Sequence, residues 1–102
     1  MARLVVLYKK AADAAAFERH YVDTHVPIAK RIPGLIRYEV SDGPVASPGS
    51  ASPYQLVATL EFASMASLRL GMSSAEGRAA AADVPNFAQA GVEMLMFDTK
   101  DL

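Results

Sequence analysis

The stretch "YQLVATLEF", residues 54–62, alternates between two kinds of side chain and predicts a β-strand. Apolar side chains occupy every second position, and the positions between them are mixed or polar. The first set is Tyr54, Leu56, Ala58, Leu60 and Phe62, and the second is Gln55, Val57, Thr59 and Glu61. Successive side chains of a strand point to opposite faces of its sheet. The pattern therefore predicts a strand with one face in a core and one less apolar face.

Three further segments predict strands. Residues 4–8, "LVVLY", are rich in β-branched and aromatic types, and residues 91–97, "GVEMLMF", are apolar on nearly both faces. Residues 35–43, "LIRYEVSDG", separate by alternation into an apolar set and a mostly charged set. A strand that is apolar on both faces is usually covered on both sides. We therefore expect cover on both faces of the first and the last strand.

A helical region is predicted over residues 11–32. Asp13 can cap its start, because a carboxylate accepts hydrogen bonds from free backbone N–H groups, and Pro33 with Gly34 ends it. Apolar side chains recur there at three- and four-residue steps. The expected stripe consists of Phe17, Tyr21, Thr24, Ile28 and Ile32.

A second helical region follows the strand at residues 54–62. Ser64 is expected to cap a helix, and a capping box of Ser73 with Glu76 predicts a further short helix through "AEGRAAAAD", residues 75–83. Pro85 ends that helix. Between the second and third strands, residues 41–53 contain three prolines and two glycines and predict a mobile loop.

The element order is therefore strand, helix, strand, strand, helix, strand. This order is typical of the α+β, ferredoxin-like βαββαβ fold, with one four-stranded antiparallel sheet and both helical regions on one face. Crossover handedness leaves few alternatives. A chain of 102 residues is enough for one domain with one modest core, so we expect a single domain over residues 1–102.

The face of the sheet without helices predicts a homodimer. It keeps apolar surface that monomers rarely expose to water, and packing of two sheets about a two-fold axis would bury it. Polar residues are interspersed on it by alternation. These are Arg37, Glu39, Gln55, Thr59, Glu61 and Glu93. Two interpretations remain open: the paired sheets enclose a partly polar hollow for a small molecule, or these side chains form salt bridges across a solid interface.

Composition excludes several classes of protein. The net charge is −1, with 10 basic and 11 acidic residues, so the basic surplus of a nucleic-acid or anionic-membrane binder is absent. There is no cysteine, which removes disulfides and thiol nucleophiles. No segment approaches the ~18 apolar residues of a membrane span, and the start lacks the pattern of a signal peptide. We expect a soluble, cytoplasmic protein.

Both histidines lie where the first helix is hardest to maintain. Pro27 has no N–H, so the carbonyl of Asp23 loses its helical partner and the turn at residues 24–26 is expected to be kinked or broken. At about 100° per residue, His25 lies roughly 50° from the centre of the apolar stripe and His20 roughly 90° away on the other side. His20 is accordingly interpreted as a solvated surface residue.

The candidate chemistry is proton transfer by His25, with Tyr8, Tyr21 or Tyr38. The alternative is that His25 only donates to a carbonyl that the helix break frees. A metal site is not expected, because histidines five residues apart on a helix point roughly 140° away from each other and no ligand set completes them. A nucleophilic serine elbow and a phosphate-binding loop are also missing.

The chain resembles the EthD family almost from end to end, from Arg3 to Phe97. The segments that carry the resemblance are "RLVVLYKK", "FERHYVDTHVPIAKRIPGLIRYEVS", "PYQLVATLEFASMASL" and "SSAEGRAAAADVPNFA". The most specific part is the spacing F-x-x-x-Y-x-x-x-H-x-P-[IL]. It is met by Phe17, Tyr21, His25, Pro27 and Ile28, and the S-x-E-G helix start by Ser74, Glu76 and Gly77.

This resemblance implies a dimeric α+β barrel. The family is named for a protein encoded with a cytochrome P450 system that degrades ethyl tert-butyl ether. The wider superfamily includes cofactor-free monooxygenases, isomerases, polyketide cyclases and decarboxylases, and haem enzymes, so the fold does not select the reaction. The shared feature is a pocket between helix and sheet that holds an apolar or aromatic oxygenated compound.

Three functions follow from the resemblance. The first is a cofactor-free enzyme of small-molecule catabolism or secondary metabolism, with His25 as acid or base and Tyr8 and Tyr38 as orienting or oxyanion donors. Tyr21, Phe17 and Ile28 are then the candidate ligand contacts. The second is a non-catalytic binding or accessory protein for an oxygenase system. The third, a haem module, has only the lone His25 in its favour, so no cofactor is expected.

Overall fold

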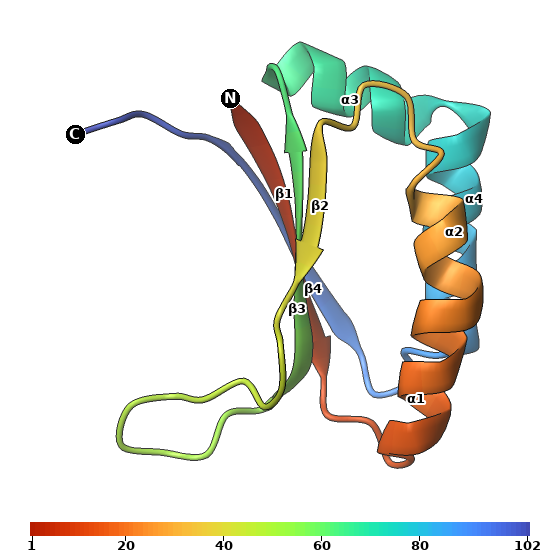
Figure 1. The fold of residues 1–102 in the computed structure, drawn as a ribbon, viewed down its shortest axis with the longest axis vertical. Helices are drawn as coiled ribbons and strands as arrows, with labels where there is room; N and C mark the ends of the chain where they lie inside the picture. The colour runs from red at the N-terminus through yellow and green to blue at the C-terminus, as the bar shows by residue number, and fades with distance from the viewer.

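A computed structural model describes residues 1–102, and its four strands pair into one antiparallel sheet in the order β2-β3-β1-β4 (Figure 1). The strands are β1 (Ala2–Lys9), β2 (Arg37–Val40), β3 (Tyr54–Phe62) and β4 (Val92–Asp98). The bounds of β3 are those that its alternation predicts. The central strands are therefore β3 and β1, and β2 and β4 form the edges.

All helices lie on one side of this sheet (Figure 1). They are α1 (Ala14–His20), a π-helical turn (Tyr21–His25), α2 (Val26–Ala29), α3 (Met65–Ser73), α4 (Ala75–Asp83) and a 3₁₀ turn (Val84–Asn86). The expected α+β, ferredoxin-like architecture is confirmed. None of these helices has the length and apolar character that a bilayer span requires.

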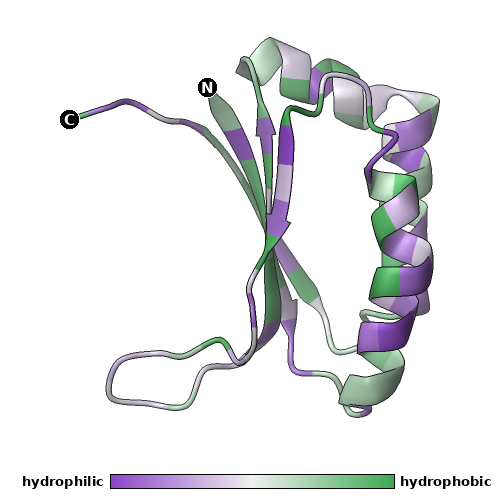
Figure 2. Cartoon of the chain, in the orientation of Figure 1, coloured by the Kyte–Doolittle hydropathy of each residue, from purple (hydrophilic) through white to green (hydrophobic).

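The core lies between the helices and alternate residues of the two central strands. On β1 the buried positions include Leu4, Val6 and Tyr8, and each side chain between them is only half-buried. On β3 the buried positions are Leu56, Ala58, Leu60 and Phe62, as the alternation predicts. Hydrophobic and hydrophilic residues both occur along the strands (Figure 2).

Helix starts follow the expected capping chemistry with one correction. The side chain of Asp13 accepts a hydrogen bond from the backbone N–H of Ala16, and Ser64 caps α3 in the same way. The expected capping box at Ser73 is wrong by one residue. Ser74 caps α4, because its Oγ accepts from the N–H of Gly77, whereas the hydroxyl of Ser73 donates to a carbonyl of the preceding turn.

Pro27 does not break the first helix. The π-helical turn places the N–H of Val26 on the carbonyl of Tyr21, five residues back, and α2 begins directly after it. Figure 1 shows α1 and α2 as one continuous rod. A π turn holds one residue more than an α turn, so it rotates the residues that follow. For this reason Thr24, which was expected on the apolar stripe, is exposed, whereas His25, which was expected beside the stripe, is buried.

The face of the sheet away from the helices is open in a single chain. Strand pairing sets Leu95 beside Val5 on this face, and Leu95 is 53% exposed. Edge strand β4 is exposed on both faces, so the cover expected on both sides is missing within one chain. Ion pairs also lie here. They join Arg3 to Glu61 at 3.1 Å, Lys9 to Glu93 at 3.0 Å and Arg37 to Glu39 at 3.3 Å.

Helix α4 approaches α3 very closely at Gly77. A Cβ atom built there would lie 2.6 Å from both the Cα and the carbonyl oxygen of Met72. Both are backbone atoms, so movement of a side chain cannot relieve the clash. The other end of α4 is Asp83. The close approach at Gly77 therefore fixes the position of the helix that carries Asp83.

Gly77→Ala should lower the free energy of unfolding by about 1–3 kcal/mol, because the added methyl group overpacks two helix backbones. At a helix position with free space, Gly→Ala would instead raise the free energy of unfolding by about 1 kcal/mol. The sign of the change in stability therefore distinguishes a close contact from free space. Urea denaturation measures the difference. Arg78→Ala, on the exposed side of the same turn, is the control and should change stability by less than about 0.5 kcal/mol.

Candidate functional site

His25 lies at the end of the π-helical turn and is buried between the helices and the sheet. Its ring lines a small cavity with three tyrosines from three different elements: Tyr8 of β1, Tyr21 of the π turn and Tyr38 of β2. The hydroxyls of Tyr21 and Tyr38 are hydrogen-bonded to each other. The structure thus brings together every aromatic residue that the sequence assigned to proton transfer.

A carboxylate that the sequence analysis did not identify lies behind the ring. Asp83, the last residue of α4, has its Oδ2 2.9 Å from Nδ1 of His25. Oδ1 of the same carboxylate lies 2.9 Å from Nε2 of His20 and accepts a hydrogen bond of 3.0 Å from the amide of Asn86. Asp83 is buried, and three donors from three segments surround it.

The π-helical turn explains how both histidines reach one carboxylate. On a regular helix, residues five apart point well away from each other, and the sequence predicted this for His20 and His25. The π turn bonds residues five apart and brings them towards the same side. The interpretation of His20 as a solvated residue is therefore wrong. Its side chain is 29% exposed, stacks on Phe87 with ring centroids 5.2 Å apart and bonds Asp83.

The protonation of this group follows from burial and bonding. Burial lowers the pKa of His25 below its usual 6.5, although the bond to Asp83 acts in the opposite direction. Burial alone would raise the pKa of Asp83, but bonds from Asn86, His20 and His25 outweigh it and the pKa lies below 3.8. Near neutral pH, His25 is neutral and donates through Nδ1–H to an ionised Asp83. Nε2 is then unprotonated and is the nitrogen left for a molecule in the cavity.

The three phenols cannot serve as bases in this cavity. Burial raises the pKa of Tyr8, Tyr21 and Tyr38, and the neighbouring phenol of Tyr38 adds to the rise at Tyr8 and Tyr21. All three therefore keep their protons over the physiological range and act as hydrogen-bond donors. The neutral imidazole of His25 is therefore the group that can accept a proton, and the tyrosine hydroxyls can donate hydrogen bonds.

The cavity is small and opens beside β4. Its volume is about 30 Å³, which is roughly the room that one or two water molecules need. Met94 lines it and is 46% exposed although it lies on the helix-covered face, so the mouth is between β4 and the helices. Met72 lines the cavity as well. Unbranched methionine side chains change shape easily, and these two can move to enlarge the space.

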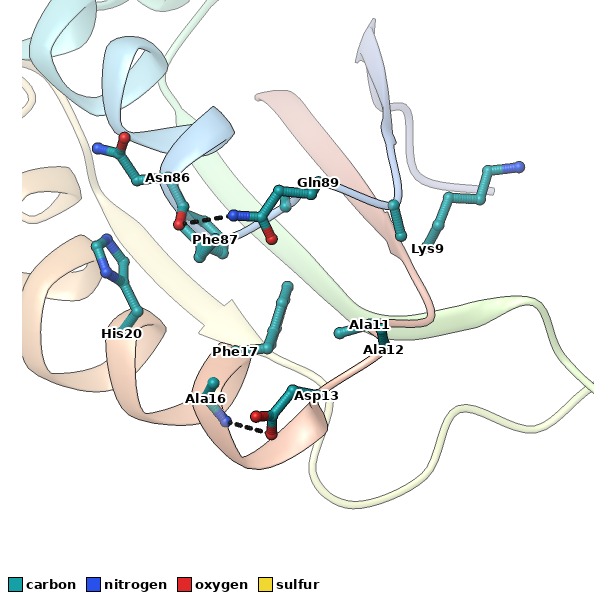
Figure 3. Close-up of a pocket in the computed structure, with 12 residues that line it drawn as sticks. Lys9, Ala11, Ala12, Asp13, Ala16, Phe17, His20, Asn86, Phe87 and Gln89 are labelled. Atoms are coloured by element: carbon teal, nitrogen blue, oxygen red, sulfur yellow. Dashed lines mark hydrogen bonds between the residues drawn. The ribbon is translucent and has the colours of Figure 1, made fainter.

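A second, larger hollow is a groove on the other side of Asp83 and its three hydrogen-bond donors. Its volume is about 550 Å³, within the size range of ligand pockets. Phe17 and Phe87 line it, His20 and Asn86 lie at one end, and Lys9 lies at the other (Figure 3). Since His25 lines the small cavity while His20 and Asn86 line this groove, Asp83 connects the two spaces.

The three residues predicted as ligand contacts do not line one common space. Tyr21 lines the small cavity, but Phe17 lines the groove. Ile28 lines neither space and lies on a shallow hollow between α2 and the start of α4. No cluster of three or more histidine, cysteine, aspartate or glutamate side chains that could hold a metal ion is present.

One signal in the sequence could have identified Asp83. It is the last residue of an alanine-rich helix, where the helix dipole disfavours an anion. A carboxylate at such a position needs donors from elsewhere in the fold. The sequence offered no way to know which, because His25 is 58 residues away along the chain.

Comparisons with known proteins agree with this architecture. A family model described as the EthD domain matches residues 9–91. A protein of Rhodococcus erythropolis, described as an uncharacterized 11.0 kDa protein in the thcB-thcC intergenic region, is 41% identical over 98 residues, 96% of this chain and 94% of that protein. A crystal structure of an EthD (ethyl tert-butyl ether d) family protein from Bacillus halodurans C-125 matches with a TM-score of 0.90 at 31% identity. It covers 98% of this chain and 99% of that one.

Two more distant structures share the fold. A dimeric ferredoxin-like protein of unknown function from Thermobifida fusca has a TM-score of 0.71 at 15% identity, covering 96% of this chain and 90% of that one. SnoaB, a cofactor-independent oxygenase from Streptomyces nogalater, has a TM-score of 0.67 at 16% identity, covering 99% and 94%. The expected dimeric α+β barrel class is thus confirmed at the level of fold.

The buried His25 should make stability depend on pH near neutrality. The pKa of His25 is lower in the folded chain than the usual 6.5, so between the folded-state pKa and 6.5 the unfolded chain binds more protons. The free energy of unfolding therefore falls as the pH falls through this range. The free energy of unfolding, measured in urea from pH 7 to pH 5, should decline. His25→Gln keeps a donor for Asp83 without a titrating ring and should flatten this slope. An equal slope in both proteins would contradict the assignment of a neutral His25.

Proposed function

Because this chain belongs to the EthD family, we propose that it acts in small-molecule metabolism by binding a small apolar or aromatic oxygenated compound between helices and sheet, where His25 transfers a proton without a cofactor. The main support is the position of His25 between the Asp83 carboxylate and the cavity with three phenols. Hydroxyl donors and one neutral base are the groups that proton abstraction beside a carbonyl requires.

The proposed step needs no other reactant. Nε2 of His25 removes a proton from the carbon next to a carbonyl group, and the electron pair of the broken C–H bond moves to the carbonyl oxygen. Tyr8 or Tyr38 donates a hydrogen bond to that oxygen as its negative charge develops. In a compound with a double bond between the β- and γ-carbons, the electron pair then returns from the oxygen through the conjugated system, and the γ-carbon takes the proton from Nε2, which shifts the double bond and completes an isomerisation. Asp83 holds the ring in the required tautomer and stabilises the imidazolium.

The small size of the cavity limits how the compound enters. Only its reacting end fits beside His25 in the space as it stands, and the rest extends through the mouth at β4. Movement of Met72 and Met94 admits a larger ring. This favours a flat or narrow compound with one oxygenated end. SnoaB, which has the same fold, is a cofactor-independent oxygenase and gives this proposal a precedent at the level of fold.

A non-catalytic binding or accessory protein is the second candidate. It is favoured by the cavity lining, which is almost entirely apolar or aromatic. Such a protein would use the cavity only to hold a ligand for another enzyme, and His25 would be a structural partner of Asp83. Binding would then survive replacement of His25, and no exchange of substrate protons would occur.

We propose that the protein forms a homodimer in which the open faces of two sheets pack together. Val5, Leu7, Val57, Leu95 and Phe97 share this face, to judge from strand pairing and alternation. Monomers rarely leave such a face in water. The Thermobifida fusca protein of the same fold is described as dimeric. Figure 1 shows the loop at residues 41–53 and the C-terminal end projecting on the same side.

Hydrogen–deuterium exchange tests the proton transfer without knowledge of the natural substrate. A panel of aromatic ketones, β-keto compounds and unsaturated ketones is incubated with protein in D₂O and followed by mass spectrometry. The protein should accelerate deuterium uptake beside the carbonyl of at least one compound. His25→Gln should reduce this rate about 10²–10⁴-fold, the usual contribution of a general base.

Thr24→Ala is the matched control, because this exposed residue precedes His25 on the same turn. It should leave the exchange rate unchanged. Equal rates in the unmodified protein and in His25→Gln would remove His25 as the base. Binding of a compound, seen by NMR, with no exchange in any protein would favour the binding function instead.

Leu95→Asp should weaken the dimer, because it places a charge among the apolar residues of the proposed interface. Sedimentation velocity should find the unmodified protein at twice the chain mass and the variant shifted towards one chain at micromolar concentration. Leu70→Asp is the control, since Leu70 is 73% exposed on helix α3, on the opposite side of the sheet. A single-chain mass for the unmodified protein would contradict the dimer.

A further inference from the structure

His20 has no part in the proton transfer proposed for His25, yet its environment is specific. Nε2 lies 2.9 Å and 3.1 Å from the two carboxylate oxygens of Asp83. Its ring stacks on Phe87 at 23° between planes. A residue that served only to fill the surface would not need both contacts. His20 is also more accessible than His25, with side-chain exposures of 29% and 6%.

We propose that His20 is a positioning residue that acts through Asp83: the two histidines share one carboxylate, and the charge on His20 sets how strongly that carboxylate stabilises a proton on His25. This inference rests on the proposed function for its catalytic meaning. The coupling between the two rings is a physical property that can be measured without any substrate.

The electrostatic argument concerns one negative charge and two possible positive charges. When His20 is neutral, the full charge of Asp83 is available to stabilise the imidazolium that His25 becomes on accepting a proton. When His20 is charged, it forms an ion pair with Asp83 and offsets that charge. It also repels a second positive charge nearby. Groups that interact in this way titrate as a coupled pair rather than independently.

No other ionisable group facing His25 can supply this effect. The phenols of Tyr8, Tyr21 and Tyr38 face it from β1, the π turn and β2, and all three are neutral. From α4, only Asp83 faces it with a charge. On the groove side, Lys9 lies at the opposite end from His20 and is paired with Glu93 at 3.0 Å (Figure 3). His20 is therefore the one group that can change the charge balance at Asp83.

The position of His20 gives this coupling a source of control. His20 lines the large groove, so solvent or a bound molecule in the groove can reach it, whereas His25 faces the small cavity. Protonation of His20 would weaken His25 as a base, and loss of that proton would strengthen it. Conditions in the groove thus adjust the reactivity in the cavity, although the two rings occupy separate spaces.

The test is an NMR titration of the His25 ring nitrogens in the full chain. Only two histidines are present, so a His20 variant leaves His25 as the single imidazole to follow. His20→Gln can never carry a charge, and His20→Arg always carries one. The midpoint of His25 should lie at higher pH in His20→Gln than in His20→Arg. Arg19→Gln removes a charge from the neighbouring exposed residue and should leave the midpoint where it is.

The unmodified protein offers a measurement that needs no variant to fold. The His25 signals should depart from the one-step curve of an isolated imidazole, because the two rings share Asp83. Equal His25 midpoints in the two His20 variants, or a single-step response in the unmodified protein, would overturn the inference. If the coupling is present and no compound exchanges its protons, the inference stands and the proposed function fails.

Discussion

The buried carboxylate of Asp83 is the interaction on which the arrangement of the site depends. An anion at the carboxyl end of a helix is disfavoured by the helix dipole and by burial, so it needs donors. Asn86, His20 and His25 supply them from three segments of the chain. In return the carboxylate sets the tautomer of His25 and leaves one ring nitrogen free on the side of the cavity. The same bonds hold α4 to the first helix, so the site and the packing of the helices have a common cause.

The two faces of the sheet have different roles. One face packs against the helices, and the cavity with His25 lies between that face and the helices, while the other face combines apolar residues with ion pairs inside a single chain. Those intrachain ion pairs show how the polar residues of the open face can be satisfied without a partner's charges. They also leave the apolar residues around Leu95 as the part of this face that gains most from burial. The proposed chemistry and the proposed assembly are thus on opposite faces of one sheet.

The histidines show where inference from sequence reached its limit. The placement of His25 near Pro27 drew attention to a residue that the structure buries beside Asp83, and the motif shared with the EthD family contains both Tyr21 and His25. The angular argument then failed for His20, because it assumed regular α-helical geometry through residues 21–25. A π turn there changes the rotation of all that follows, and it arises where Pro27 cannot donate the next helical hydrogen bond. Pro27 indicated that the helix is irregular before it, but it did not indicate a π-helical turn rather than a kink or a break.

The sequence by itself determined the strands, the helix starts at Asp13 and Ser64 and the ferredoxin-like order, because periods of two and of three to four residues, with capping side chains and prolines, act over short distances along the chain. It also determined which face of β3 is buried and that one face of the sheet lacks helices. Only the tertiary structure decided that Asp83 meets His25 across 58 residues, that His20 shares this carboxylate and that Ile28 lies away from the cavity. These pairings depend on how α4 packs against the first helix, and no local periodicity encodes a contact between side chains so distant in sequence.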